Sequence, residues 1–140
     1  MDDLDPGPVI DAHSRADAIA AGQLIEARAE LVRDARLRYP VALTRAAWAD
    51  CVQWTDEDGE ETGALQDEDG RLFDVLTMSR AALTRASGDR AVATVHRVPR
   101  GVLYREDDAD DIPLVYLLVT VAPGDDWKPC ITISQLNEED

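Results

Sequence analysis

Leu114-Val115-Tyr116-Leu117-Leu118-Val119-Thr120-Val121 is the stretch that decides the expected fold, because it carries no charge and is rich in residues that favour strands. Two further runs have the same character, Ala91–Val98 before it and Cys130–Ser134 after it. Acidic and glycine-containing turns separate the three runs, and short connections favour antiparallel pairing. The sequence therefore predicts a three-stranded antiparallel meander after Gly88.

Before Gly88 the apolar residues recur at the spacing of a helix. Ser14 and Thr44 are suitable N-caps for two of the expected helices. The acid-rich segment Asp56–Asp69 contains two glycines and is expected to form a loop or a short hairpin. The predicted class is α+β, with N-terminal helices packed on a C-terminal three-stranded antiparallel sheet. The helices are expected over residues 14–21, 28–38, 45–54 and 72–86.

A chain of 140 residues suits one domain, and a hydrophobic fraction of 45% is enough to bury a core. We expect a flexible acidic tail over residues 1–8, a single α+β domain over 9–136 and an acidic tail over 137–140. The longest uncharged run, residues 112–124, has 13 residues, too few to cross a membrane. The N-terminus lacks the pattern of a secretory signal. Two cysteines make no disulfide framework, so we expect a cytoplasmic setting.

The acidic residues are gathered into runs. The chain has 29 acidic and 14 basic residues, a formal net charge of −15. Residues 70–105 have the opposite net charge, with seven arginines and two aspartates. The first large cluster contains Asp56, Glu57, Asp58, Glu60, Glu61, Asp67, Glu68 and Asp69. The second contains Glu106, Asp107, Asp108, Asp110 and Asp111.

The motif Asp-Glu-Asp-Gly occurs twice and raises the question of a calcium loop. An EF-hand needs oxygen ligands at positions 1 and 12 when its glycine is at position 6. Aligning either Gly59 or Gly70 with that glycine places an apolar side chain at position 12 and tryptophan or leucine at position 1. The sequence therefore predicts no metal site, and nothing in it indicates a cofactor.

Catalysis by a nucleophile needs a thiol or hydroxyl beside a base. His96 lies in an expected strand, and an approach to Cys130 across the sheet is one interpretation, whereas Cys51 lies on the apolar face of a helix. Buried structural cysteines and a strand histidine are the commoner arrangement. We expect that the protein is not an enzyme.

Two tryptophans lie beside acids. Trp54 precedes the first large cluster, and Trp127 follows Asp125 and Asp126. Aromatic side chains flanked by carboxylates suit an interface that receives arginines. The alternative is that both tryptophans pack beneath loops.

Four segments, together with the turn Pro123–Asp126, resemble an uncharacterised family of short acidic bacterial proteins carried on plasmids, phages and other mobile elements. The resemblance covers roughly residues 9–134. Phe73 stands where a tryptophan is usual in that family. The resemblance implies a mobile-element context and supplies no catalytic motif. The four segments are Ser14–Ile19, Tyr39–Thr44, Cys51–Asp56 and Asp67–Leu76.

These features favour an acidic inhibitor that imitates a nucleic acid and blocks a host-defence or DNA-processing protein, of the anti-restriction or anti-CRISPR type. Duplex DNA carries one charge per about 1.7 Å, so the thirteen acids of the two large clusters match about 22 Å of duplex. The expected partner is a basic nucleic-acid-binding protein, contacted through both large clusters and Trp54. We expect no direct binding to nucleic acid or membrane, and a monomer or weak homodimer.

Four alternatives stay open. The acidity can serve solubility alone, although solubility needs no clustering. The chain can be an adaptor or regulator that binds one protein partner through its tryptophan-containing surface. It can also associate with itself, residues 70–105 of one copy meeting an acidic cluster of another. An enzyme is the last alternative.

Overall fold

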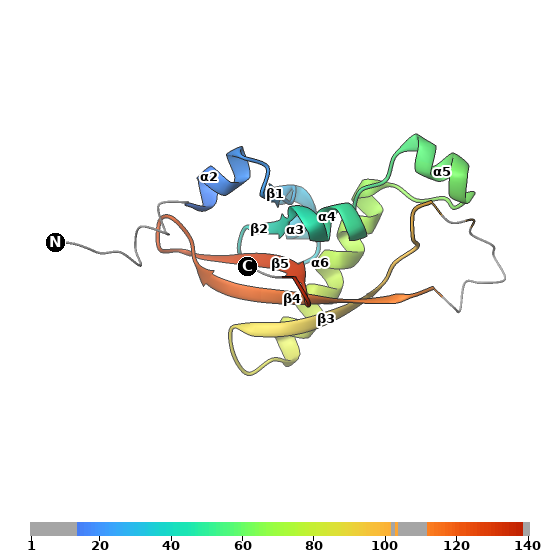
Figure 1. The fold of residues 1–140 in the computed structure, drawn as a ribbon. Coiled ribbons are helices and arrows are strands. Elements are labelled where there is room, and N and C mark those ends of the chain that lie inside the picture. The colour runs from blue at the N-terminus through green and yellow to red at the C-terminus, as the bar shows by residue number, and fades with distance from the viewer. Residues whose placement is uncertain (1–13, 102, 104–111, 139–140) are drawn as a thin grey trace.

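The computed structural model describes residues 14–101, 103 and 112–138, in which five helices lie with a five-stranded mixed sheet (Figure 1). The strand order is β1-β2-β5-β4-β3. The strands are β1 (Leu24–Glu26), β2 (Val41–Thr44), β3 (Arg90–His96), β4 (Leu114–Pro123) and β5 (Pro129–Gln135). The helices are α2 (Arg15–Ala20), α3 (Ala29–Asp34), α4 (Arg45–Cys51), α5 (Asp56–Thr62) and α6 (Glu68–Arg85).

The structure corrects the predicted fold. The class is α+β, but the expected three-stranded antiparallel sheet is wrong, because β1 and β2 extend the sheet to five strands. β3 pairs with β4 and β4 with β5, both antiparallel, whereas β2 pairs with β5 in parallel, Val41 lying opposite Ile131. The helices do not precede the sheet as a block, since β1 and β2 alternate with α2, α3 and α4 along the chain.

The two missed strands left little trace in the sequence. β1 has three residues and β2 has four. Val41, Ala42 and Leu43 are each at most 1% exposed, so β2 is covered on both faces and shows no alternation of apolar and polar residues. Its partner β5 lies far along the chain, and only tertiary pairing makes residues 41–44 a strand.

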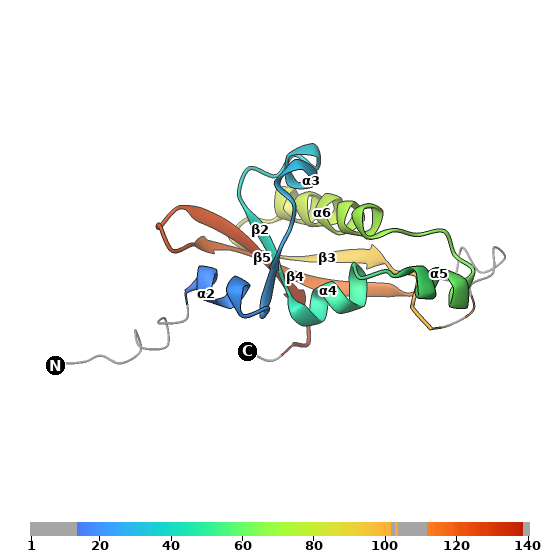
Figure 2. The ribbon, with the colours of Figure 1, turned by 90° about the horizontal axis from the view of Figure 1, so that it is seen from above.

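One face of the sheet packs on the helices to form the main core. Leu72, Val75 and Leu76 of α6 share this core with Leu117 of β4 and Ile133 of β5. α6 packs along β3 and β4, and α4 contacts β2 and β5, as Figure 2 shows from above. The face of β3 and β4 turned away from α6 keeps several apolar side chains exposed, namely Val92, Leu114 and Tyr116.

Side chains begin four of the helices by accepting hydrogen bonds from free backbone N–H groups. Ser14 caps α2, Thr44 caps α4, Thr55 caps α5 and Asp67 caps α6. The carboxylate of Asp125, from the turn between β4 and β5, also accepts from the backbone N–H groups of residues 15 and 16. This acid therefore ties α2 to the end of the sheet.

Glu138 has two contacts with the fold, whereas residues 139–140 of the expected tail over 137–140 lie outside the described residues. The carboxylate of Glu138 accepts one hydrogen bond from the hydroxyl of Thr44 and one from the backbone N–H of Gln135, both at 2.8 Å. Glu138 thus fastens the end of β5 to the start of α4. At the other terminus, the expected tail over residues 1–8 lies outside the described residues.

In the part of the chain that the structure describes, no helix has both the length and the apolar character needed to cross a membrane.

Two leucines test how far the core determines stability. Leu117 is fully buried, whereas Leu65 is 98% exposed. We expect Leu117→Ala to lower the free energy of unfolding by about 2–5 kcal/mol, because it removes apolar contacts and leaves a cavity. Leu65→Ala should change it by less than about 0.5 kcal/mol. Urea denaturation followed by circular dichroism measures both, and equal losses would contradict this description of the core.

Candidate functional site

Arg71 is the centre of a polar network where α4, α5 and α6 meet the segment after β3. It lies in the first turns of α6, on the same stripe as Val75 and Ser79, and is only 4% exposed. Burial lowers the pKa of its guanidinium, with smaller contributions from the neighbouring Arg97 and Arg100. No described carboxylate forms an ion pair with Arg71, so neutral acceptors must satisfy its N–H groups.

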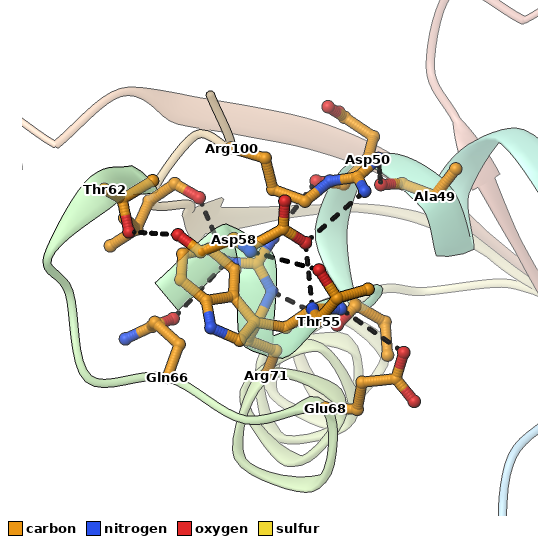
Figure 3. A network of polar contacts seen from close by, with 12 residues as sticks. Ala49, Asp50, Thr55, Asp58, Thr62, Gln66, Glu68, Arg71 and Arg100 are labelled. Carbon is orange, nitrogen blue, oxygen red and sulfur yellow. Dashed lines mark hydrogen bonds and ion pairs between the residues drawn. The ribbon is translucent and has the colours of Figure 1, made fainter. Parts of the chain in front are cut away.

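Those acceptors come from three segments, as Figure 3 shows. Nε donates to the carbonyl of Val52 at 3.2 Å, and Nη2 donates to the carbonyl of Asp50 at 3.3 Å. Nη1 donates to the carbonyl of Val98 at 3.0 Å and to the side-chain oxygen of Gln66 at 3.3 Å. One guanidinium therefore joins the end of α4, the segment after β3 and the residues before α6.

The ring of Trp54 lies over this guanidinium, and the residue is buried. Its ring centroid is 4.8 Å from the Arg71 guanidinium carbon, a cation–π contact, and the residue is 9% exposed. Trp54, Ala64 and Val98 form a small second core, on which Ile112 packs. The side chain that we expected to help bind a partner is thus buried beneath α5, as in the alternative interpretation.

α5 corrects the expectation of a loop or hairpin in the acid-rich segment. A capping box starts it, since Thr55 and Asp58 exchange hydrogen bonds with each other's backbone N–H groups at 3.0 and 2.9 Å. The acids in its first turn stabilise the helix, because they lie at the positive end of its dipole. Gly63, with a φ of 76°, ends the helix. The sequence signal for this helix was limited to its two ends, the Thr55-x-x-Asp58 capping box and the terminating Gly63. The residues between them show no apolar period.

Asp58 is the buried acid of α5. The backbone N–H of Thr55 is the main group that holds the pKa of its carboxyl below the ordinary value, and Arg100 contributes. The Arg100 guanidinium lies 3.6 Å from this carboxylate and also donates to the carbonyl of Ala49. Asp58 therefore stabilises the fold and is shielded from any partner.

The acids of the first large cluster divide into two groups. Asp67 caps α6, Glu68 accepts from the backbone N–H of Trp54, and Asp69 receives two hydrogen bonds from Arg28 at 2.9 and 2.8 Å. With Asp58, half of the eight acids thus have contacts within the chain. The other four are exposed and project from α5: Asp56, Glu57, Glu60 and Glu61.

The second large cluster lies outside the described residues: Glu106, Asp107, Asp108, Asp110 and Asp111. The nearest described residues are Leu103 before it and Ile112 after it. Arg100 contacts Asp58, and Ile112, which follows Asp111 directly, packs on the core under α5. Arg100 therefore contacts α5 itself, and Ile112 lies against the small core that Trp54, Ala64 and Val98 form.

A polar hollow of about 360 Å³ lies beside the network, lined by Asp50, Arg97, Arg100 and Gln135 among others. Arg97 pairs with Asp50 at 3.3 Å, and Gln135 donates to the same carboxylate at 2.8 Å. Because Asp50 and Asp58 neutralise the two arginines, the hollow offers no excess of charge to a ligand.

A family model matches residues 2–140, and it describes a family of unknown function, DUF6573. The chain belongs to this family. Comparison with curated proteins and with solved structures found no match. The resemblance to an uncharacterised family is confirmed.

Trp127 of this DUF6573 chain lies at the other end of the molecule from α5, in the turn between β4 and β5 (Figures 1 and 2). Its side chain is 84% exposed and its backbone has a φ of 66°. That left-handed conformation is typical of glycine. An exposed tryptophan at such a position is a candidate contact residue.

The cysteines and His96 of the family member do not form a nucleophile and base. Burial, with the nearby Asp50, raises the pKa of Cys51 to about 12, so this thiol stays protonated at neutral pH. His96 pairs with Leu114 of β4 and Cys130 with Ala122, positions eight residues and about 27 Å apart along the strand. The approach of His96 to Cys130 considered from the sequence is wrong.

Both Asp-Glu-Asp-Gly motifs start helices. Gly59 lies within α5 and Gly70 within the first turn of α6, so neither supplies the turn of a calcium loop. Among the described residues, no three His, Cys, Asp or Glu side chains gather as the ligands of a metal ion would.

Replacing Arg71 by lysine tests the network. We expect Arg71→Lys to lower the free energy of unfolding by about 2 kcal/mol, because a single ammonium cannot reach acceptors in three segments and some would stay buried without a donor. Arg80→Lys, an exposed change on the same helix, is the matched control and should cost less than about 0.5 kcal/mol. Hydrogen exchange should also show faster opening of α5 in Arg71→Lys only.

The raised pKa of Cys51 predicts a loss of stability in alkali. In the unfolded chain this thiol ionises from its ordinary value of 9.0, whereas in the folded chain it keeps its proton to about 12. Unfolding therefore releases a proton in this window, and stability falls as pH rises from 9 to 12. Between pH 8 and pH 10.5 we expect wild type to lose about 1–2 kcal/mol more than Cys51→Ala. Parallel losses in the two proteins would refute the assignment.

Proposed function

We propose that this protein is an acidic inhibitor that occupies the nucleic-acid groove of a basic protein by imitating the charge of a duplex. The proposal includes a cytoplasmic host-defence or DNA-processing protein as the target and a mobile element as the genetic context. The observation that carries it is the helix α5, which presents four exposed carboxylates at one end of the molecule (Figure 1).

The charge density of α5 supports this proposal. A seven-residue helix is about 10 Å long, and α5 carries four exposed carboxylates, about one per 2.6 Å. Duplex DNA carries one charge per about 1.7 Å. Exposed carboxylates at this density attract a groove shaped for phosphates, and binding releases the counterions that both surfaces hold.

The anchoring of the second cluster also supports it. The residues on either side of this segment contact α5 or the core beneath it, through Arg100 and Ile112. The cluster itself, residues 106–111, lies outside the described residues, so the support comes from these flanking contacts alone. The partner-facing set is narrower than the sequence suggested, since Trp54 and Asp58 are buried and Asp67, Glu68 and Asp69 have partners within the chain.

A second candidate function is an adaptor that binds one protein partner without imitating nucleic acid. The exposed Trp127 favours it, because aromatic anchors are enriched at protein interfaces and this one is remote from α5. The two candidates predict different sensitive residues, the acids of α5 for the mimic and Trp127 for the adaptor.

Neutralising α5 tests the mimic. The variant carries Asp56→Asn, Glu57→Gln, Glu60→Gln and Glu61→Gln. The immobilised wild type should retain basic DNA-binding proteins from a host lysate, and competing duplex DNA should release them. We expect the variant to bind the same purified partner at least about tenfold more weakly, because its groove-facing charge is lost. Affinity of the wild type should fall steeply with added salt.

The matched control removes the same number of charges elsewhere, with Asp17→Asn, Glu30→Gln, Asp34→Asn and Asp89→Asn, all exposed positions outside α5. It should bind within about twofold of wild type, because steering by net charge alone is a small effect compared with contact charges. An equal loss of affinity in both variants would mean that net charge, and not the acids of α5, determines binding. Binding that ignores DNA and salt but fails in Trp127→Ala would replace the mimic by the adaptor.

A further inference from the structure

Two adjoining hollows follow the turn from α3 into β2, and we call them together the α3–β2 groove. The larger, of about 640 Å³, lies between α3 and the strands β1 and β2. The smaller, of about 320 Å³, lies between this turn and the C-terminal half of α6. Leu37, Arg38 and Tyr39 line both hollows. No residue of α5 lines either, so the groove is separate from the proposed inhibitory surface.

The charge of the groove is opposite to that of the chain. Five arginines line it against a single acid, Glu26, in a protein of net charge −15. Arg28 is held by Asp69 and Glu30. The other four are exposed and form no ion pair with a described carboxylate: Arg33, Arg36, Arg38 and Arg80. Among the described residues, the groove therefore offers guanidinium groups without an ion pair. A guanidinium can donate two parallel hydrogen bonds to a phosphate or carboxylate group.

Arg36 occupies a backbone position that suits glycine. α3 ends in a Schellman motif, in which the N–H of Leu37 donates to the carbonyl of Val32 and that of Arg36 to the carbonyl of Arg33. Arg36 has a φ of 66°, a conformation that costs any residue with a side chain. An arginine at this point of the groove gives up stability, which is the pattern of a residue placed for binding.

The groove also has an apolar base and an aromatic wall. Val32 and Val41 are buried at its base, and the ring of Tyr39 is 37% exposed. An exposed aromatic ring beside arginines provides a surface on which a planar base stacks while the cations bind its phosphates. The larger hollow has a volume within the range of small-molecule sites.

We propose that the α3–β2 groove binds a nucleoside phosphate, its base against Tyr39 and its phosphates between Arg36, Arg38 and the arginines beside them. The proposal goes beyond the inhibitory function and does not depend on it. A free nucleotide has the two parts that the groove accommodates, a flat apolar ring and a compact group of negative charges.

Isothermal titration calorimetry in 50 mM salt tests this proposal with each of the four ribonucleoside triphosphates, with adenosine and with inorganic triphosphate. We expect saturable binding of one nucleotide per chain by at least one triphosphate, at least about tenfold tighter than adenosine or inorganic triphosphate. Tyr39→Ala should weaken nucleotide binding at least about fivefold and leave inorganic triphosphate unchanged, because it removes only the stacking surface.

Arg36→Gly separates binding from folding. This variant should melt about 3 °C higher than wild type, because glycine relieves the left-handed strain, and yet bind nucleotide at least about fivefold more weakly. Arg85→Gln, an exposed arginine of α6 outside the groove, is the control and should leave affinity unchanged. The α5 variant described above should bind nucleotide as wild type does.

Three results would overturn the proposal. The first is the absence of saturable binding for all four triphosphates at 1 mM. The second is inorganic triphosphate that binds as tightly as the nucleotides, which makes the groove a general anion site. The third is that the wild type binds no nucleotide but associates with itself at low salt, and that Arg36→Gly abolishes this association. That result would mean that the groove binds acids of a second copy.

Discussion

A buried guanidinium that forms no ion pair with a described carboxylate is the constraint on which the arrangement of α4, α5 and α6 depends. Among the described residues, Arg71 is compensated by carbonyl and amide oxygens and by the face of Trp54. The acceptors come from three separate segments, so the cost of burying the charge is offset only when all three are in place. The position of α5 follows from this condition, because Trp54 and Gln66 lie on either side of that helix in the chain.

The acids of the chain serve two purposes that composition alone cannot separate. Asp58, Asp67 and Asp125 accept hydrogen bonds from helix N-termini, and Asp69 pairs with an arginine. The acids that remain exposed on α5 have no such contact among the described residues. A count of carboxylates thus overstates the number of free acids, because half of the first large cluster has contacts within the chain.

The sequence predicted the helices and strands in which apolar residues recur at a regular spacing. The apolar stripe of α6 and the β-branched runs of β3, β4 and β5 are long enough for that period to be visible. β2 is too short and too evenly buried to show a period, and in the sequence only the capping residues mark α5. Arg71 was visible only as an arginine at an apolar position of α6, and the arginines of the α3–β2 groove gather only when α3 and α6 pack together.

The position of β5 has a consequence for how the chain is made. Among the described strands, β5 comes last in sequence, yet it lies at the centre of the sheet and joins the β1–β2 pair to the β3–β4 pair. The two halves cannot merge until residues 129–135 have left the ribosome. All five strands must therefore be present before the main core closes, and the contacts that close it join residues far apart in sequence, which slows the search for the native state. During that interval the abundant negative charge has a further effect, because repulsion between nascent chains keeps their unfinished apolar strands apart.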